Sequence, residues 1–165
     1  MLDLCNTDDK SQSGKQGYQA ELQKDGAEWK MLSFDSYEVA CSKNLRSLCT
    51  AALQFMQDHE KFAFDSFNFK EKLMPYIKSD SVFRCPVGKD DAVGYSFNHN
   101  LENMTFNEFD KISDVSYKVV MFYEGKNEQF DFRHNGRTII CFANGVRTDF
   151  SKDDPALKNS VQWKW

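Results

Sequence analysis

The sequence lacks several features that would point directly to a class of protein. Its longest apolar runs, residues 119–123 and 139–143, are far shorter than the roughly 20 residues that a membrane-spanning helix needs. It also lacks a basic excess, because 21 Lys and Arg stand against 25 Asp and Glu, with a net charge of −4 and a pI near 5.4. Proteins that bind nucleic-acid phosphates usually carry such an excess, so this composition argues against a nucleic-acid partner.

The motifs of common catalytic and metal sites are also missing. The three His residues, His59, His99 and His134, are widely separated, and there is no Cys-x-x-Cys or His-x-x-x-His pair. We therefore expect no zinc site and no other cofactor. The sequence also contains no nucleophile elbow and no phosphate-binding loop.

The C-terminal segment contains acidic and aromatic residues that need a separate interpretation. Asp149, Asp153 and Asp154 are weak candidates for calcium ligands, but they lack the Asp-x-Asp-x-Asp-Gly order of a dedicated site. A solvated acidic loop is therefore the preferred interpretation. Trp163 and Trp165 predict a tail that packs back on the core, with an exposed contact surface as the alternative.

What the sequence contains is sufficient for one folded domain. No repeat or long Pro/Gly/Ser linker follows residue 35, and 41% hydrophobic residues, including 15 Phe, can form a sizeable core. Residues 1–34 are mostly polar and predict a flexible arm, with a globular domain over 35–165. Cys5 in this arm is interpreted as a free cysteine; a lipid-modified cysteine is the alternative.

An amphipathic helix is predicted over about residues 36–60. Apolar side chains recur there at the three-four spacing of one helix face. These residues are Cys41, Leu45, Leu48, Cys49, Ala52, Phe55, Met56 and His59. Asp35 or Ser36 is suited to cap the helix, which must bury its apolar stripe on another element. Residues 62–110 are expected to wrap around the domain as an irregular segment.

A four-stranded antiparallel sheet is predicted towards the C-terminus. The strand-like runs are 115–123, 129–134, 137–142 and 146–150. Asn135-Gly136 and Asn144-Gly145 are pairs that favour type I′ turns, so residues 129–150 are expected to form a three-stranded meander. Together with the helix, this sheet predicts an α+β domain.

Five short motifs then resemble, in order, landmarks of the pseudopilin-like branch of the type IV pilin family. They are Cys41-Ser42-Lys43-Asn44-Leu45, Leu73-Met74-Pro75-Tyr76-Ile77, Phe83-Arg84-Cys85-Pro86, Tyr95-Ser96-Phe97-Asn98, and His134 followed after nine residues by Asn144-Gly145. The last resembles the prepilin-type processing-associated domain named for a His, nine residues and an Asp-Gly pair. Asn144 stands where that family usually has Asp. The family's basic leader and its apolar, Glu-containing first helix have no counterpart in this sequence.

The resemblance implies a pilin-like fold and a non-enzymatic role. The chain would be a soluble head in a type II secretion or type IV pilus-like apparatus of the bacterial cell envelope, periplasmic or extracellular. Its partners would be other pilin-like subunits or secretion-apparatus proteins. One alternative is a free-standing secreted or lipid-anchored binding module of the same fold. A second, less favoured alternative is a hydrolase that uses His134 and Cys141.

The resemblance also bears on the cysteines. Cys41 and Cys49, eight residues apart on one helix, would be separated by about 12 Å and cannot form a disulfide. Cys41 and Cys85 match the helix-start and Cys-Pro cysteines of the family, so we predict a disulfide between them. Cys49 and Cys141 are then expected to be reduced core residues. The alternative is that all five cysteines are reduced.

Overall fold

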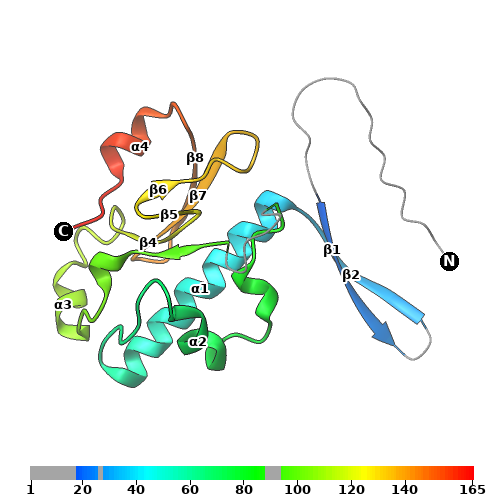
Figure 1. The fold of residues 1–165 in the computed structure, drawn as a ribbon, viewed down its shortest axis with the longest axis horizontal. Helices are drawn as coiled ribbons and strands as arrows, with labels where there is room; N and C mark the ends of the chain where they lie inside the picture. Colours follow the sequence, from blue (N-terminus) through cyan, green and yellow to red (C-terminus); the bar gives the residue numbers. More distant parts are fainter. Residues whose placement is uncertain (1–17, 26–27, 88–93) are drawn as a thin grey trace.

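The computed structural model describes residues 18–25, 28–87 and 94–165, and its central feature is one helix lying along one face of an antiparallel sheet (Figure 1). The helix is α1 (Tyr37–His59), which matches the predicted range of about 36–60. The sheet has the strand order β3 (Ser96–Phe97), β4 (Val120–Tyr123), β7 (Arg137–Phe142) and β8 (Arg147–Ser151). The predicted α+β class, with a helix and a four-stranded antiparallel sheet, is confirmed.

Short elements fill the remainder of the described chain. They are the hairpin β1 (Tyr18–Asp25) and β2 (Glu28–Ser36), α2 (Phe69–Leu73), the 3-10 helices η1 (Met74–Tyr76), η2 (Asp80–Phe83) and η3 (His99–Leu101), α3 (Phe106–Lys111), the small hairpin β5 (Gly125–Lys126) and β6 (Gln129–Phe130), and α4 (Pro155–Ser160). The segment 62–110, expected to be irregular, therefore contains several short helices. No helix in the described ranges is both long and apolar enough to cross a bilayer.

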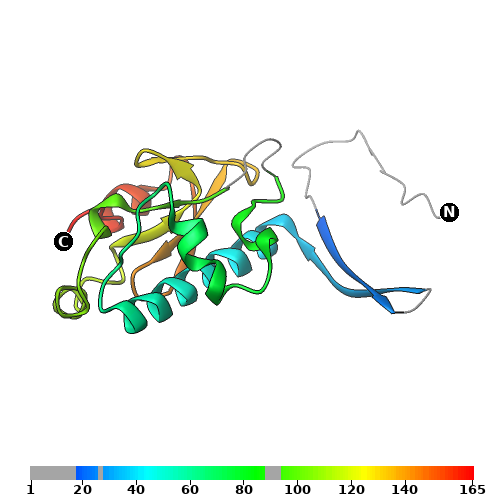
Figure 2. The same ribbon diagram turned by 60° about the horizontal axis from the view of Figure 1, so that its bottom comes forward.

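The hairpin of β1 and β2 lies largely within residues 1–34, the segment that the sequence predicts to be a flexible polar arm. It precedes α1 directly and extends away from the rest of the domain in both views (Figures 1 and 2). Regular structure therefore begins well before the predicted boundary at residue 35. Residues 1–17, which include Cys5, lie outside the described residues.

The main sheet differs from the predicted meander in one strand. Strand β4 pairs directly with β7, with Phe122 opposite Cys141, while β6 pairs only with β5. The runs of β4 and β7 are buried almost throughout, so they pair with each other in the centre of the sheet. The more polar run that begins at Gln129 is excluded from this position. The prediction of three strands over residues 129–150 is therefore wrong, although the hairpin of β7 and β8 is confirmed.

The two Asn-Gly pairs form different turns. Asn135 and Gly136 both have positive φ (51° and 79°), and His134 and Arg137 exchange backbone hydrogen bonds, as a type I′ turn requires. At the second pair only Gly145 has positive φ, and its N–H donates to the carbonyl of Phe142. This geometry fits a type I turn followed by a glycine bulge, so the predicted type I′ geometry is wrong there.

The face of α1 that packs on the sheet is apolar, as predicted. Seven of the eight residues predicted for this face are buried: Cys41, Leu45, Leu48, Cys49, Ala52, Phe55 and Met56. His59, at the end of the helix, is exposed instead. The buried face packs with sheet residues such as Met121, Phe122 and Cys141, and this cluster forms the larger part of the core.

The opposite face of the sheet is covered by the C-terminal segment. A second buried cluster includes Tyr123, Ile140 and Phe150, and partly buried residues of the C-terminal segment pack against it. The ring of Trp163 stacks on Phe130, with 5.1 Å between their centroids. The predicted packed tail is confirmed for Trp163, while Trp165 remains 52% exposed. The sheet is thus enclosed between α1 and the C-terminal segment.

Candidate functional site

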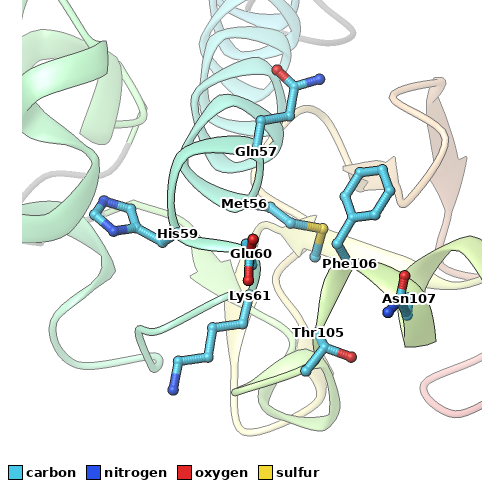
Figure 3. A pocket seen from close by; sticks show the side chains of 8 residues that line it. All are labelled: Met56, Gln57, His59, Glu60, Lys61, Thr105, Phe106 and Asn107. Atoms are coloured by element: carbon cyan, nitrogen blue, oxygen red, sulfur yellow. The ribbon is translucent and has the colours of Figure 1, made fainter.

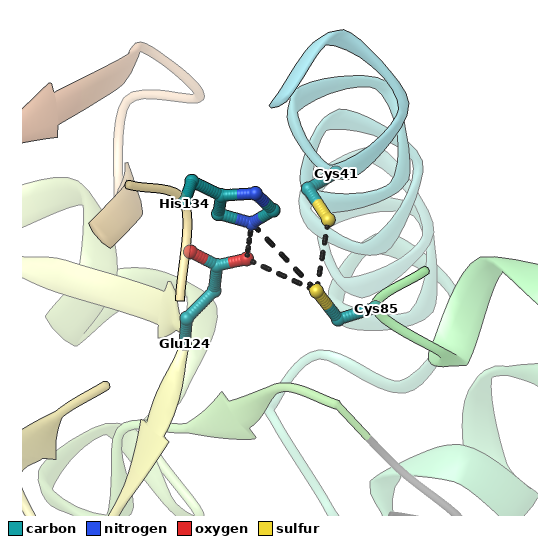
Figure 4. A group of neighbouring side chains, drawn as sticks. All are labelled: Cys41, Cys85, Glu124 and His134. Carbon is teal, nitrogen blue, oxygen red and sulfur yellow. Dashed lines mark hydrogen bonds and ion pairs between the residues drawn. The ribbon is translucent and has the colours of Figure 1, made fainter. Parts of the chain in front are cut away.

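Four side chains with chemical functions meet inside the domain (Figure 4). They are Cys41 of α1, Cys85 after η2, Glu124 at the end of β4, and His134 before β7. All four are buried, and one donor atom from each lies within 4.8 Å of the other three. We call this cluster the four-residue centre.

The two cysteines are brought together by contacts between α1 and the segment around Cys85. Asn44, one turn after Cys41, donates side-chain hydrogen bonds to the carbonyl of Arg84 (3.0 Å) and to the hydroxyl of Tyr95 (3.2 Å). Gly94 allows the chain to pass close to this segment, because a Cβ atom there would lie 2.4 Å from the backbone nitrogen of Cys85. As a result, the two sulfur atoms lie 3.1 Å apart.

Glu124 completes the centre from the sheet. It follows the fully buried strand β4 and is itself 0% exposed. Its Oε2 accepts a hydrogen bond from the backbone N–H of Ile139 (2.9 Å), and its Oε1 lies 2.7 Å from Nε2 of His134. Glu124 is not among the residues predicted for a site, because it stands where the strand-like run 115–123 ends and resembles the first polar residue of a turn. Its position directly after an unbroken apolar strand was the available signal.

His134 contacts its two neighbours through the same ring nitrogen. Nε2 lies 3.7 Å from Sγ of Cys85 and also faces Glu124. In a nucleophile–His–carboxylate triad, the nucleophile and the carboxylate contact opposite ring nitrogens. The arrangement here therefore differs from a catalytic triad, even though the residue types are suitable.

The buried charges of the centre influence one another strongly. The hydrogen bond with Cys41 lowers the pKa of Cys85 to about 4. The same contact, together with burial, raises the pKa of Cys41 well above its ordinary value. Burial alone would lower the pKa of His134, but the hydrogen bonds with Cys85 and Glu124 outweigh it and raise this pKa to about 10. The centre thus favours a thiolate on Cys85 next to a protonated imidazole.

The donor types determine what the centre can do chemically. Thiolate, imidazole and carboxylate are the ligand groups of zinc sites in proteins, so these four residues could hold a metal ion. The neighbouring thiols could also be oxidised to a disulfide. Acid–base chemistry on a dissolved substrate is disfavoured, since the side chains of His134 and Glu124 are only 1% and 0% exposed.

The disulfide in the structure differs from the predicted one. Cys49 of α1 is bonded to Cys141 of β7, whereas Cys41 and Cys85 are free thiols. The expectation that Cys49 and Cys141 are reduced is therefore wrong. Cys49 lies two turns after Cys41 on the same buried face, and this part of the face lies over the central strand. The predicted Cys41–Cys85 pair is adjacent but not bonded.

The pairing of His134 with Cys141 is likewise not found. Cys141 has no thiol, because its sulfur is bonded to Cys49, and the ring of His134 faces Cys85 and Glu124. The other signature residues, Asn144 and Gly145, form the turn between β7 and β8 and do not belong to the centre. The side-chain oxygen of Asn144 accepts a hydrogen bond from the N–H of Val146 there.

The weak calcium candidates have other roles in the structure. Asp149 forms an ion pair with Arg137 on the neighbouring strand. Asp154 caps α4, since its side chain accepts a hydrogen bond from the N–H of Ala156. Within the described ranges, Asp149, Asp153 and Asp154 do not form a group of metal-ligand atoms.

Two surface cavities are relevant to the site. A cavity of about 200 Å³ is lined by His134 together with residues of α1, β7 and β8, so it reaches one side of the four-residue centre. A larger hollow of about 720 Å³ lies at the C-terminal end of α1. Met56 lies in its middle, with His59 and Phe106 to either side (Figure 3). We call this hollow the α1–α3 groove.

Comparisons with known proteins add no family assignment. No protein-family model matches the chain, and no curated protein or solved structure matches it significantly.

Proposed function

We propose that this chain is the non-enzymatic head of a pilin-like protein with a structural role in assembly. The assembly would be a type II secretion or type IV pilus-like apparatus of the bacterial cell envelope, with the head in the periplasm or outside the cell. Its partners would be other pilin-like subunits or proteins of that apparatus. The packing of α1 along a four-stranded antiparallel sheet is compatible with this fold.

The observation that supports the proposal most is the spatial convergence of the motifs behind the resemblance. Asn44 of the first motif contacts Tyr95 of the Tyr-x-x-Asn motif. Cys41 of the first motif contacts Cys85 of the Cys-Pro motif, which in turn contacts His134 of the signature. Matches that arose by chance along the sequence would have no reason to meet in space. Four of the five motifs instead share one network of contacts.

The geometry favours a structural role over catalysis. The four-residue centre is buried, and His134 presents one nitrogen to both of its neighbours. The free-standing secreted or lipid-anchored module remains the second candidate. The disulfide between Cys49 and Cys141 suits an oxidising compartment and therefore fits both candidates equally.

Crosslinking in the cells that make the protein tests the proposal. The chain, tagged at its C-terminus, is treated with an amine-reactive crosslinker and then recovered from the envelope, cytosolic and culture-supernatant fractions. We expect it in the envelope fraction, joined to pilin-like subunits identified by mass spectrometry. An unrelated periplasmic protein of similar abundance is the control for random capture. Recovery from the supernatant without crosslinks favours the free-standing module, and a cytosolic location contradicts both candidates.

A second measurement addresses catalysis. The purified protein is incubated with ester, peptide and phosphate substrates, and we expect no turnover above that of buffer. Turnover that disappears in His134→Ala, while the circular dichroism spectrum is retained, contradicts a non-enzymatic role.

A further inference from the structure

We propose that the four-residue centre binds one Zn²⁺ ion through Sγ of Cys41, Sγ of Cys85, Oε1 of Glu124 and Nε2 of His134. The ion would be structural and would join four segments of the chain. This inference goes beyond the proposed function and does not depend on it.

The geometry of the donor atoms fits a small tetrahedral ion. Zinc lies about 2.0–2.3 Å from such ligands, so the donors of a tetrahedral site are about 3.3–3.8 Å apart. In the structure, Sγ of Cys85 lies 3.1 Å from Cys41, 3.6 Å from Glu124 and 3.7 Å from His134. Nε2 of His134 and Oε1 of Glu124 lie 2.7 Å apart, and the remaining separations do not exceed 4.8 Å. Compared with the tetrahedral separations, this pair would have to move apart by about 0.6 Å and the most distant pair closer by about 1 Å.

The combination of donors selects zinc over other common ions. Two thiolates exclude calcium and magnesium, which prefer oxygen ligands. A carboxylate and an imidazole in the same site are less suited to copper(I), which favours sulfur alone. Two cysteines, one histidine and one acidic residue are all regular zinc ligands, and a closed set of four protein ligands is typical of structural zinc.

Neighbouring groups already orient the ligands as zinc sites require. The N–H of Ile139 holds Oε2 of Glu124, which leaves Oε1 directed at His134 and Cys85. Asn44 donates hydrogen bonds to the hydroxyl of Tyr95 and to the carbonyl of Arg84, and so holds the segment before Cys85 against the helix that carries Cys41. Such outer contacts fix the ligand geometry and tune the affinity for the metal.

The charge of the bound ligands is also compatible with a divalent ion. In the metal-bound state, two thiolates, one carboxylate and a neutral imidazole would carry three negative charges, which would be costly to bury without a cation. On binding, four metal–ligand bonds form, and the protons held by the thiol of Cys41 and the imidazole of His134 pass to solvent. The divalent ion leaves the site with a single negative charge. A surface cavity lies beside His134.

The test uses the reduced protein and the metal itself. The full chain is purified under anaerobic, reducing conditions, and any bound metal is removed with a chelator. The metal-free protein is then titrated with Zn²⁺ and with Co²⁺. We expect one metal per chain and, with Co²⁺, the thiolate charge-transfer band and the intense d–d bands of a tetrahedral site. These bands require no variant, so they also test the ligand set if a variant does not fold.

Variants assign the ligands. His134→Ala and Cys85→Ser are expected to reduce the affinity for zinc at least tenfold and to weaken the cobalt bands, whereas His59→Ala in the α1–α3 groove is expected to change neither. The double variant Cys49→Ala and Cys141→Ala is expected to retain the thiolate band. Failure of the reduced wild-type protein to bind zinc overturns the proposal. So does a thiolate band of undiminished intensity in Cys85→Ser, or a Cys41–Cys85 disulfide in the protein isolated from its own cells.

Discussion

The four-residue centre and the α1–α3 groove are two very different concave regions of the same domain. The groove is the larger hollow and is open to solvent, and its lining residues Gln57, His59 and Asn107 are exposed. The centre is almost closed to solvent, but its four donor atoms converge on one point. Both regions border α1, one near its first turn and the other at its last (Figures 3 and 4).

The difference shows that convergence of side chains, and not the size of a hollow, marks the chemically significant site. In the groove, polar side chains lie on the rim of the hollow and Phe106 remains half exposed. In the centre, each of the four residues has a side-chain partner among the other three, and Glu124 also accepts a hydrogen bond from the backbone of Ile139. Replacing one residue should therefore lower the free energy of unfolding markedly in the centre and hardly at all in the groove.

The largest effect is expected for Glu124→Ala. The substitution leaves the ring nitrogen of His134 and the N–H of Ile139 without their buried acceptor. Breaking a buried charged pair in this way lowers the free energy of unfolding by about 3–5 kcal/mol. Gln57→Ala, in the groove on the exposed face of α1, should change it by less than about 0.5 kcal/mol. Urea unfolding of both variants measures the difference, and equal effects would contradict the contrast.

The disulfide between Cys49 and Cys141 should have the next largest effect. It joins α1 to β7 and spans 92 positions of the sequence. Replacing both cysteines by Ala should lower the free energy of unfolding by about 2–4 kcal/mol, since the unfolded chain regains freedom. Mass spectrometry of peptides from the unreduced protein checks the linkage itself. A peptide that joins Cys41 to Cys85 in place of this pair would show that the assignment of the disulfide is wrong.

Asn44→Ala removes a residue that holds the segment before Cys85 in place but does not belong to the four-residue centre. The variant loses two side-chain hydrogen bonds, to Arg84 and to Tyr95, which together are worth about 1–3 kcal/mol. If the centre holds zinc, the affinity for the metal should also fall by about 10–100-fold. Thr50→Ala, exposed on the same helix, is the matched control. A loss of stability with unchanged metal affinity would show that Asn44 does not position the cysteines.

Thr105→Ala should have a smaller effect, confined to the groove. Thr105 caps α3 and forms a reciprocal capping box with Glu108. Loss of such a cap costs about 1 kcal/mol. Thr105→Ser, which keeps the hydroxyl, should retain most of the stability. We expect neither variant to alter metal binding or the reactivity of Cys85, and a change in either would link the two regions.

The smallest effect concerns the partly exposed ion pair between Lys70 and Asp80, the first residue of η2. The hydrogen bond from Lys70 lowers the pKa of Asp80 below its ordinary value of 3.8. A carboxyl group with a lowered pKa stabilises the fold above its unfolded-state pKa, and this contribution is lost as the pH falls through the lower native value. NMR titration should show the pKa of Asp80 rising towards 3.8 in Lys70→Ala. An unchanged pKa would show that Lys70 is not its main partner.

Much of the fold could be predicted because it follows from local patterns. The three-four spacing from Leu45 to Met56 specified the helix and its buried face. The apolar run of β7 and the turn at Asn144-Gly145 specified the hairpin with β8. The place in the sheet that was predicted for residues 129–134 is taken by β3 instead. This could not be predicted, because it depends on which strands pair with the central strands β4 and β7.

The candidate site was predictable only in part. Cys41, Cys85 and His134 were identified through the resemblance, and the structure places them together. Glu124 was not predicted, because its position directly after the apolar run of β4 also fits the first polar residue of an exposed turn, and only the packing around it shows that it is buried. The choice of disulfide was wrong because Cys49 and Cys141 are paired by the packing of α1 on β7, a contact between residues 92 positions apart.

A crystal of the reduced protein grown with zinc gives the most direct test of the account, since data collected on both sides of the zinc absorption edge locate the metal. The account predicts one strong anomalous peak within bonding distance of Cys41, Cys85, Glu124 and His134, and none in the α1–α3 groove. Absence of a peak in the centre, with continuous density joining the sulfur atoms of Cys41 and Cys85, would contradict it.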